Sequence, residues 1–157
     1  MDIITRSAAE TIELGRRIGS ALQGGEVFAV EGPLGSGKTQ LIKGIAAGAD
    51  AEALDQVNSP TFVLVNEYQG QFDIFHIDAY RLDTAAEFEM LGFDDFLYPQ
   101  SVVLIEWADK VTTVLETLDC ISVKFRHISQ EQRAISIQNL PNHLKSLIEG
   151  PRERGNN

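Results

Sequence analysis

A glycine-rich run in the first third of the chain has the residue types that bind a polyphosphate. Residues 32–39 read Gly-Pro-Leu-Gly-Ser-Gly-Lys-Thr and match the pattern G-x-x-x-x-G-K-[ST] at every fixed position. Gly35 and Gly37 permit the dihedral angles that let several backbone amides point at one anion. Lys38 is expected to reach the β- and γ-phosphate oxygens, and Thr39 to bind Mg²⁺ through its hydroxyl. The run predicts a nucleotide site.

The predicted nucleotide-binding set comprises this loop and the first residues of the helix expected after it. Its members are Gly32, Leu34, Gly35, Ser36, Gly37, Lys38, Thr39 and Gln40. The helix directs the positive end of its dipole at the same anion. The chain contains no Asn-Lys-x-Asp motif for guanine, which favours ATP over GTP. A dinucleotide fingerprint is excluded because Gln40 stands where its third glycine is required.

Two acidic residues are candidates for the metal and water chemistry that a phosphate loop requires. Asp78 and Glu106 each end an apolar run that is expected to form a strand. In phosphate-loop enzymes, an acid at the end of a neighbouring strand holds Mg²⁺ or orients the attacking water. We therefore predict Lys38, Asp78 and Glu106 as catalytic residues, and Thr39 and Glu106 as metal ligands. The spacing leaves open which acid lies nearer the metal.

Four further residues are predicted to act as a switch or to couple the site to a partner. Thr61 lies between the loop helix and the next strand, where many phosphate-loop proteins carry a segment that senses the γ-phosphate. Tyr80 and Arg81 follow the first candidate acid, and Arg81 has the charge to contact the γ-phosphate or a partner. Trp107 follows the second acid and is a candidate lid residue. The alternatives are an ordinary turn for Thr61, a surface ion pair for Arg81, and a core or rim aromatic for Trp107.

The elements that position these residues follow from hydrophobic periodicity and capping signals. Capping boxes at Ser7–Glu10 and Thr84–Glu87 predict two helix starts, and Gly24–Gly25 and Gly92 predict the corresponding ends. Two more helices are expected over 38–48 and 141–148. The expected strands are 26–31, 62–68, 72–77, 101–107, 121–125 and 134–137, and 50–58 is expected to be a loop.

This pattern predicts an α/β fold of the P-loop NTPase type with three layers. Its mixed central sheet is expected to have parallel strands around the phosphate loop and antiparallel hairpins beside them. Both hairpins are expected from paired alternating runs, 62–68 with 72–77 and 121–125 with 134–137. We expect a single domain over 1–150 and a flexible tail over 151–157, and the strand order stays open.

The composition is that of a globular protein with an acidic average charge. Of 157 residues, 43% are hydrophobic and 23% are charged, and the formal net charge is −10. That charge repels nucleic acid and anionic membranes, which argues against direct binding to either. The single cysteine, Cys120, excludes an intramolecular disulfide, and no signal-peptide or membrane-spanning pattern is present. These features predict a cytoplasmic protein.

Taken together, the motifs resemble those of the bacterial TsaE (YjeE) family. Four blocks carry the resemblance in the family's order and approximate spacing: Gly32–Thr39, Ser59–Phe62, His76–Leu82 and Glu106–Trp107. It covers nearly the whole chain. Pro33 stands where the family commonly has an acidic residue, and Ala108 where proline is common. Neither is a phosphate or metal ligand, so only modest changes in loop stiffness are expected.

The resemblance implies a small ATPase required for threonylcarbamoylation of the tRNA adenosine beside the anticodon, in tRNAs that read codons beginning with A. In that family the protein acts on a complex of TsaB with TsaD, which holds the catalytic metal and transfers the group. ATP and Mg²⁺ are the implied cofactors, intrinsic hydrolysis is weak and rises with the partners, and tRNA is contacted indirectly or weakly. By the same resemblance, Glu106 joins the metal ligands beside Thr39, and Asp78 helps to set the water.

Two other functions stay open from the residues alone. A small-molecule or nucleoside kinase would usually require an arginine-rich lid, whereas the arginines here are dispersed along the chain. A nucleotide-sensing adaptor would bind ATP without using its hydrolysis. Product analysis separates the first alternative from an ATPase, and blocking hydrolysis while ATP stays bound separates the second.

Overall fold

The computed structural model describes residues 1–53, 65–82 and 84–149 of the chain. Within these ranges, eight strands form one sheet with the order β1-β8-β7-β2-β6-β5-β4-β3. The strands are β1 (Asp2–Thr5), β2 (Val27–Glu31), β3 (Glu52–Ala53), β4 (Val65–Gln69), β5 (Asp73–Asp78), β6 (Ser101–Glu106), β7 (Ile121–His127) and β8 (Arg133–Gln138). The central strands β7, β2, β6 and β5 are parallel, and antiparallel strands extend the sheet on both sides. The predicted mixed sheet is confirmed.

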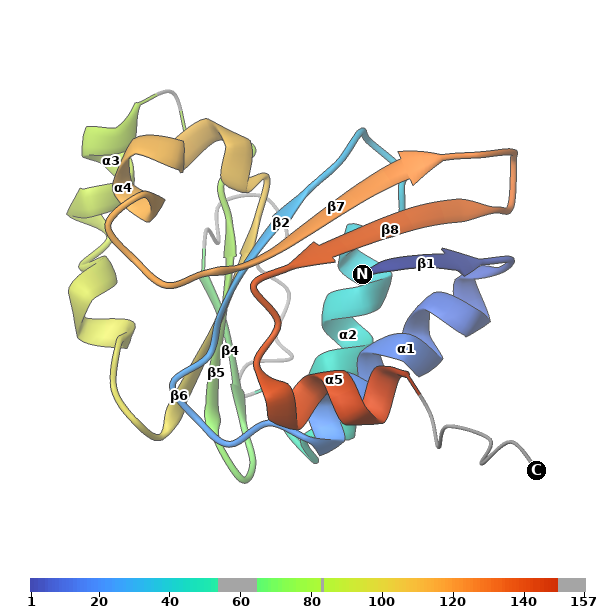
Figure 1. Cartoon of the computed structure of the whole chain (residues 1–157). Helices are drawn as coiled ribbons and strands as arrows, with labels where there is room; N and C mark the ends of the chain where they lie inside the picture. Colours follow the sequence, from blue (N-terminus) through green and yellow to red (C-terminus); the bar gives the residue numbers. More distant parts are fainter. Residues whose placement is uncertain (54–64, 83, 150–157) are drawn as a thin grey trace.

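Helices cover both faces of the sheet and give three layers (Figure 1). The α-helices are α1 (Ala8–Ser20), α2 (Lys38–Gly48), α3 (Ala85–Met90), α4 (Thr112–Leu115) and α5 (Asn142–Ile148), and the 3₁₀ helices are η1 (Phe93–Phe96) and η2 (Ala108–Val111). Figure 1 shows α1, α2 and α5 on one side of the sheet and α3 and α4 on the other. None of the helices in the described ranges is long and apolar enough to cross a membrane.

Alternate residues of the central strands fill two separate cores. In β2, Phe28 and Val30 pack with the core under α1, α2 and α5, whereas Val27 and Ala29 face the core under α3 and α4. All six residues of β6 are buried. A strand buried on both faces reads as a continuous apolar run, which is why this segment was predictable as an interior strand.

The contact between α1 and α2 depends on glycines that bring the two backbones together. A Cβ at Gly44 would overlap the backbone carbonyl oxygen of Ile12, and one at Gly15 would overlap that of Leu41. No side chain can move aside to relieve these overlaps, because the obstructing atoms belong to the backbone. The glycines therefore set the distance between α1 and α2, and α2 carries the residues of the predicted nucleotide site.

Most of the predicted elements are confirmed. Ser7 caps α1 by accepting a hydrogen bond from the amide of Glu10 at 3.1 Å, and Thr84 caps α3 in the same way from Glu87 at 3.2 Å. The helix predicted over 38–48 has those bounds. Both predicted hairpins are present, as β4–β5 and β7–β8. The helix predicted from Pro141 is α5, for which this proline is the N-cap.

Other details of the prediction are wrong. The first helix ends at Ser20, well before Gly24–Gly25, and 50–58 includes the short strand β3, which pairs with β4. The sequence did not predict β1, η1, η2 or α4. The start of the predicted strand 62–68 and the predicted tail 151–157 lie outside the described residues, and the extent of the domain stays a prediction.

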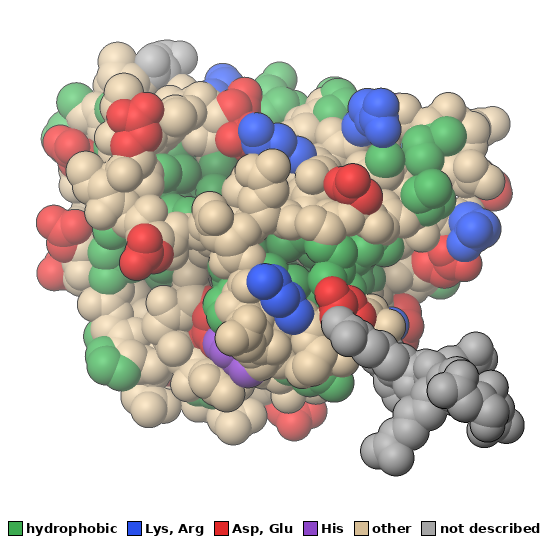
Figure 2. Space-filling model, viewed as in Figure 1, with side chains coloured by type: hydrophobic (Ala, Val, Ile, Leu, Met, Phe, Trp, Pro, Cys, Tyr) green, Lys and Arg blue, Asp and Glu red, His purple; other side chains and the backbone are tan. Residues whose placement is uncertain are grey.

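Acidic side chains gather over α3 and α4, as the upper left of Figure 2 shows. The exposed acids of this region are Glu87, Glu89, Asp94, Asp95, Asp109 and Glu116. Their negative field is unfavourable for contact with a nucleic acid backbone. These six side chains contribute to the formal net charge of −10.

Overfilling the α1–α2 contact provides a test of this packing. We expect Gly44→Ala to lower the free energy of unfolding by about 1–3 kcal/mol, because the added methyl has to push the helices apart. Chemical denaturation measures the change. The control Lys43→Ala, at an exposed position on the same helix, is expected to change stability by less than about 0.5 kcal/mol. Equal stabilities of Gly44→Ala and the control would contradict the described packing.

Candidate nucleotide-binding site

The predicted phosphate loop joins the end of β2 to the start of α2. Gly37 is the N-cap of α2 and has a φ of 104°, a conformation that favours glycine over any L side chain. At Gly32, which has a φ of 152°, a Cβ would lie 2.7 Å from the Cβ of Phe125 and 2.8 Å from Oγ of Ser36. The loop therefore requires glycine at both positions, and its backbone turns directly into the helix.

The ammonium group of Lys38 lies against its own loop. Nζ donates hydrogen bonds to the carbonyl oxygens of Gly32 (2.7 Å) and Pro33 (2.9 Å), and it lies 3.8 Å from the centre of the Trp107 ring. Burial lowers the pKa of Lys38, while the carboxylates of Glu106, Asp109 and Asp78 act in the opposite direction. A partly desolvated cation attracts an anion more strongly than one in water does.

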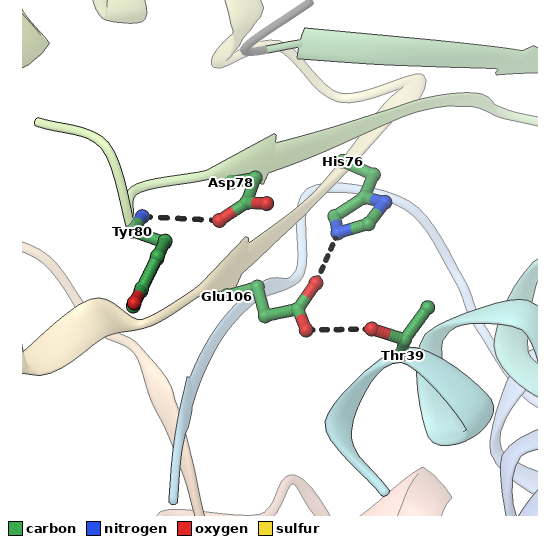
Figure 3. Close-up of polar contacts among 5 residues, drawn as sticks. All are labelled: Thr39, His76, Asp78, Tyr80 and Glu106. Carbon is green, nitrogen blue, oxygen red and sulfur yellow. Dashed lines mark hydrogen bonds and ion pairs between the residues drawn. The ribbon is translucent and has the colours of Figure 1, made fainter. Parts of the chain in front are cut away.

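Thr39, Glu106 and His76 form a continuous line of hydrogen bonds across three elements (Figure 3). The Thr39 hydroxyl, at the start of α2, donates to Oε1 of Glu106 at 2.7 Å. Nε2 of His76, on β5, lies 2.8 Å from Oε2 of the same carboxylate. Glu106 ends β6 and is 6% exposed, as is His76. Both oxygens of the buried carboxylate are therefore hydrogen-bonded.

This environment keeps Glu106 ionised. Burial by itself raises the pKa of Glu106, but the hydrogen bonds from His76 and Thr39 and the charge of Lys38 outweigh burial, so the pKa lies below its usual value. An ionised carboxylate accepts hydrogen bonds and does not donate them. The hydroxyl proton of Thr39 therefore points at Glu106, which leaves the lone pairs of the Thr39 oxygen available to another partner.

Asp78, the second predicted acid, lies beside Glu106 on the neighbouring parallel strand. The two residues are register partners of β5 and β6, so their side chains emerge on the same face at the same edge of the sheet. Asp78 is half-buried, and its Oδ1 accepts a hydrogen bond from the amide of Tyr80 at 3.0 Å. In this arrangement Glu106 contacts Thr39, and Asp78 lies one strand further from the loop helix.

The rings of the predicted coupling residues Tyr80 and Trp107 pack against each other at the edge of the site, with their planes tilted by 48°. Their ring centres lie 4.8 Å apart. Lys110 donates to the carbonyl oxygen of Tyr80 at 2.6 Å and lies 4.9 Å from the centre of its ring. With Lys38 near the ring of Trp107, the two aromatic rings and two ammonium groups form one cluster, in which Tyr80 is 48% exposed. Any movement of Lys38 toward a ligand changes the surroundings of Trp107.

The remaining predicted residues have different environments. Leu34 is 78% exposed at the tip of the loop, whereas Ser36 is fully buried and its hydroxyl has no hydrogen-bond partner among the described residues. Gln40 lines a cavity of about 380 Å³ beside the loop, together with Thr11 of α1. Arg81 is exposed. Thr61 lies outside the described residues, so its switch role stays a prediction.

Arg133, which the sequence did not single out, fastens the loop to the β7–β8 hairpin. Its guanidinium donates to the carbonyl oxygens of Ser36 (3.1 Å) and Gly35 (3.3 Å) on the loop side. The same group donates to three carbonyl oxygens at the hairpin tip, those of Ser129, Gln130 and Gln132. Because a rigid fork of donors suits several acceptors at once, an arginine at this position holds the two segments together.

Sequence reasoning also missed a role for His76. The residue occurs in one of the blocks quoted for the resemblance, but its spacing to the other histidines excluded only a metal site. A usable signal was its position two residues before Asp78, since alternate residues of a strand share a face. For the contact of Arg133 with the loop no local signal exists, because Ser36 and Gly35 lie 97 and 98 positions earlier in the chain.

A second, wider cavity is lined by none of the residues predicted for the nucleotide site. It has a volume of about 710 Å³ and is lined by residues of β2, α4 and the start of β7, with Glu26 and His143 among them. Glu26 accepts hydrogen bonds from the amides of Gln23 and Gly24 and pairs with His143 at 3.0 Å. These contacts occupy Glu26, and no residue of the Thr39–Glu106–His76 line borders the cavity.

A glycine loop between a parallel strand and a helix, facing an acid on the adjacent parallel strand, defines the P-loop class of α/β proteins. The family model for the threonylcarbamoyl adenosine biosynthesis protein TsaE matches residues 5–135. The chain belongs to the TsaE family. Its fold is also similar to the crystal structure of YdiB from Bacillus subtilis, with a TM-score of 0.71 and 26% identity over 95% of this chain and 91% of that one.

Curated relatives agree with this membership. The tRNA threonylcarbamoyladenosine biosynthesis protein TsaE of Treponema pallidum is 31% identical over 137 residues, which cover 87% of this chain and 99% of the relative. The protein of the same name from Bacillus subtilis is 32% identical over 146 residues, covering 92% and 89%. That of Mycobacterium tuberculosis strain H37Rv is 34% identical over 137 residues, covering 81% and 79%. The resemblance stated from the motifs is thereby confirmed, and with it the family's role in this tRNA modification.

The role of Arg133 can be tested without any ligand. We expect Arg133→Ala to loosen the loop, so that backbone order parameters over 33–37 fall from about 0.85 toward 0.6 or below in NMR relaxation. The control Arg126→Ala removes an exposed arginine from β7 and is expected to leave these order parameters unchanged. Unaltered loop dynamics in Arg133→Ala would show that the guanidinium does not restrain the loop.

Proposed function

We propose that this chain binds ATP with Mg²⁺ and hydrolyses it in the cytoplasm, driving a step of tRNA threonylcarbamoylation by a complex of TsaB and TsaD. One observation carries the proposal: the 2.7 Å hydrogen bond from the Thr39 hydroxyl to the buried carboxylate of Glu106. It connects the first turn of the loop helix to the end of the strand beside β2. Phosphate-loop enzymes use this pairing of hydroxyl and acid for their metal ion.

The donor atoms at Thr39 and Glu106 fit Mg²⁺. Hydroxyl and carboxylate oxygens are the hard ligands that this ion prefers, and Thr39 keeps its lone pairs because its proton is donated to Glu106. When bound, Mg²⁺ supplies positive charge that offsets the charge of the β- and γ-phosphates. In the described parts of the chain no group of three or more His, Cys, Asp and Glu side chains could hold a metal ion. The pair Thr39 and Glu106 therefore suits an ion that takes its other ligands from phosphate and water.

The loop and its neighbours are suited to the rest of the nucleotide. Lys38 now donates to two neutral carbonyl oxygens, and phosphate oxygens are stronger acceptors because they are charged. The amides at the start of α2 and its dipole favour the same anion. The cavity of about 380 Å³ beside Gly35–Gly37 lies within the size range of small-molecule sites, and we assign it to the nucleoside.

Residues at the edge of the site are the basis for proposing hydrolysis and its dependence on partners. Asp78 is half-buried next to Glu106, where its carboxylate can orient a water molecule. Leu34 and Tyr80 are exposed apolar side chains on segments that border the site. A partner that covers them would exclude water and strengthen every electrostatic contact inside. The acidic surface over α3 and α4 agrees with tRNA contact that is indirect or weak.

Loss of the loop cation is expected to remove nucleotide affinity. We expect Lys38→Ala to weaken Mg²⁺–ATP binding by about 100-fold or more, because charge-assisted hydrogen bonds to phosphate are lost. Calorimetry measures the affinity, and the fluorescence of the single tryptophan, Trp107, follows the same titration. Lys43→Ala, which removes an exposed lysine from the same helix, serves as the control. Wild-type affinity in Lys38→Ala would contradict the assigned phosphate site.

Reconstitution with purified TsaB and TsaD tests the function as a whole. We expect tRNA modification and release of free phosphate to require this chain, and Glu106→Gln to lower phosphate release about 100-fold, because the anionic partner of Thr39 is lost. Asp78→Asn is expected to impair turnover as well, with stability affected less than turnover. The control Glu13→Gln changes an exposed glutamate of α1.

Two outcomes of the reconstitution would contradict the proposal and favour an alternative. A phosphorylated acceptor in place of free phosphate would indicate a kinase. Full modification with a Glu106→Gln chain that binds ATP but does not hydrolyse it would indicate a nucleotide-sensing adaptor.

A further inference from the structure

His76 is a buried histidine whose ring contacts the site from outside the phosphate loop. It lies on β5 two residues before Asp78, and its register partner on β6 is Leu104. Its side chain therefore emerges on the same face as Asp78 and Glu106, the face covered by α1 and α2. Nε2 lies 2.8 Å from Oε2 of Glu106, and both residues are buried.

The hydrogen bond fixes which ring nitrogen carries the proton. An ionised carboxylate can only accept, so the proton between the two residues belongs to Nε2 of His76. Nδ1 is buried and has no hydrogen-bond partner among the described residues. A lone pair is less costly to leave without a partner there than a second N–H group would be, and this assigns the Nε2–H tautomer to the ring.

The same contact fixes the direction of the carboxylate. A glutamate side chain has three rotatable torsions, and the last of them is broad and poorly restrained. His76 holds Oε2, which leaves Oε1 facing the Thr39 hydroxyl on the opposite side (Figure 3). Without the imidazole, Oε2 would lose its donor in a buried position, and the carboxylate would turn toward other donors or water.

We propose that His76 is a positioning residue of the nucleotide site: by donating Nε2–H to Oε2 of Glu106 it holds Oε1 against Thr39, in the orientation required for Mg²⁺–ATP. The inference rests on the proposed function. Groups that orient a metal-binding carboxylate typically change metal affinity or activity by 10- to 100-fold when they are removed. A purely structural histidine would affect the stability of the fold and leave the Mg²⁺ dependence unchanged.

The chain offers a matched control for this pair. His143 on α5 forms a similar contact with Glu26, in which Nε2 and Oε1 lie 3.0 Å apart. Both residues line the cavity of about 710 Å³, which none of Thr39, His76 and Glu106 borders. Removing this imidazole breaks a pair of the same chemistry without touching the site. Both histidines can also be replaced by glutamine, whose side-chain amide places an N–H donor near the position of Nε2.

The test compares His76→Leu, His76→Gln and His143→Leu. For His76→Leu we expect the Mg²⁺ concentration for half-maximal ATP binding to rise about 10- to 100-fold and kcat with TsaB and TsaD to fall by a similar factor. ATP binding in the presence of EDTA is expected to stay within about twofold, since Lys38 and the loop amides are untouched. His76→Gln is expected to restore most of the loss, and His143→Leu to behave as wild type.

A ligand-free measurement accompanies the kinetics. We expect ¹⁵N NMR of the free wild-type chain to report the Nε2–H tautomer of His76, and the Thr39 methyl signal to shift in His76→Leu but not in His143→Leu.

Should His76→Leu not fold, His76→Asn replaces it, because asparagine is too short to reach Oε2. Wild-type Mg²⁺ dependence in His76→Leu, or equal behaviour of the Gln and Asn variants, would overturn the inference alone. A wild-type chain that does not bind Mg²⁺–ATP would overturn the proposed function and this inference together.

Discussion

The burial of the Glu106 carboxylate is the constraint on which the site depends. An ionised group that is 6% exposed costs several kcal/mol unless hydrogen bonds satisfy it. Here the two donors come from different elements, Thr39 at the start of α2 and His76 on β5. Satisfying one charge therefore fixes the loop helix against the ends of two parallel strands. The strand order β2-β6-β5 is what brings these three side chains together.

The rest of the fold restrains the same helix and loop from other directions. Glycines of α1 and α2 let the two helices pack backbone to backbone, and Arg133 ties the loop to the β7–β8 hairpin. The cation of Lys38 lies between two loop carbonyls and the ring of Trp107, which packs against the tilted ring of the exposed Tyr80. A change in the position of Lys38 would therefore alter the surroundings of Trp107 and, through that ring, those of the exposed Tyr80.

Features determined by local chemistry were predictable from the sequence. The phosphate loop and α2 follow from glycine spacing and a helix start, and the β4–β5 hairpin follows from alternation and a glycine-containing turn. Features that depend on distant partners were not predictable. The edge strand β1 obtains its hydrogen bonds from β8 near the other end of the chain, and β3 comprises two residues paired with β4. His76 likewise hydrogen-bonds a residue 30 positions later. Its position two residues before Asp78 indicates a shared face, but the strand order is what brings Glu106 to it.

The most direct test of this account is a crystal structure of the chain with Mg²⁺ and a non-hydrolysable ATP analogue. We expect the triphosphate to lie along the amides of 32–39, the Thr39 hydroxyl oxygen to bind the metal ion, and Glu106 to keep its hydrogen bonds to Thr39 and His76. A triphosphate bound elsewhere, or a metal ion held without Thr39 and with Glu106 turned away from it, would contradict the account.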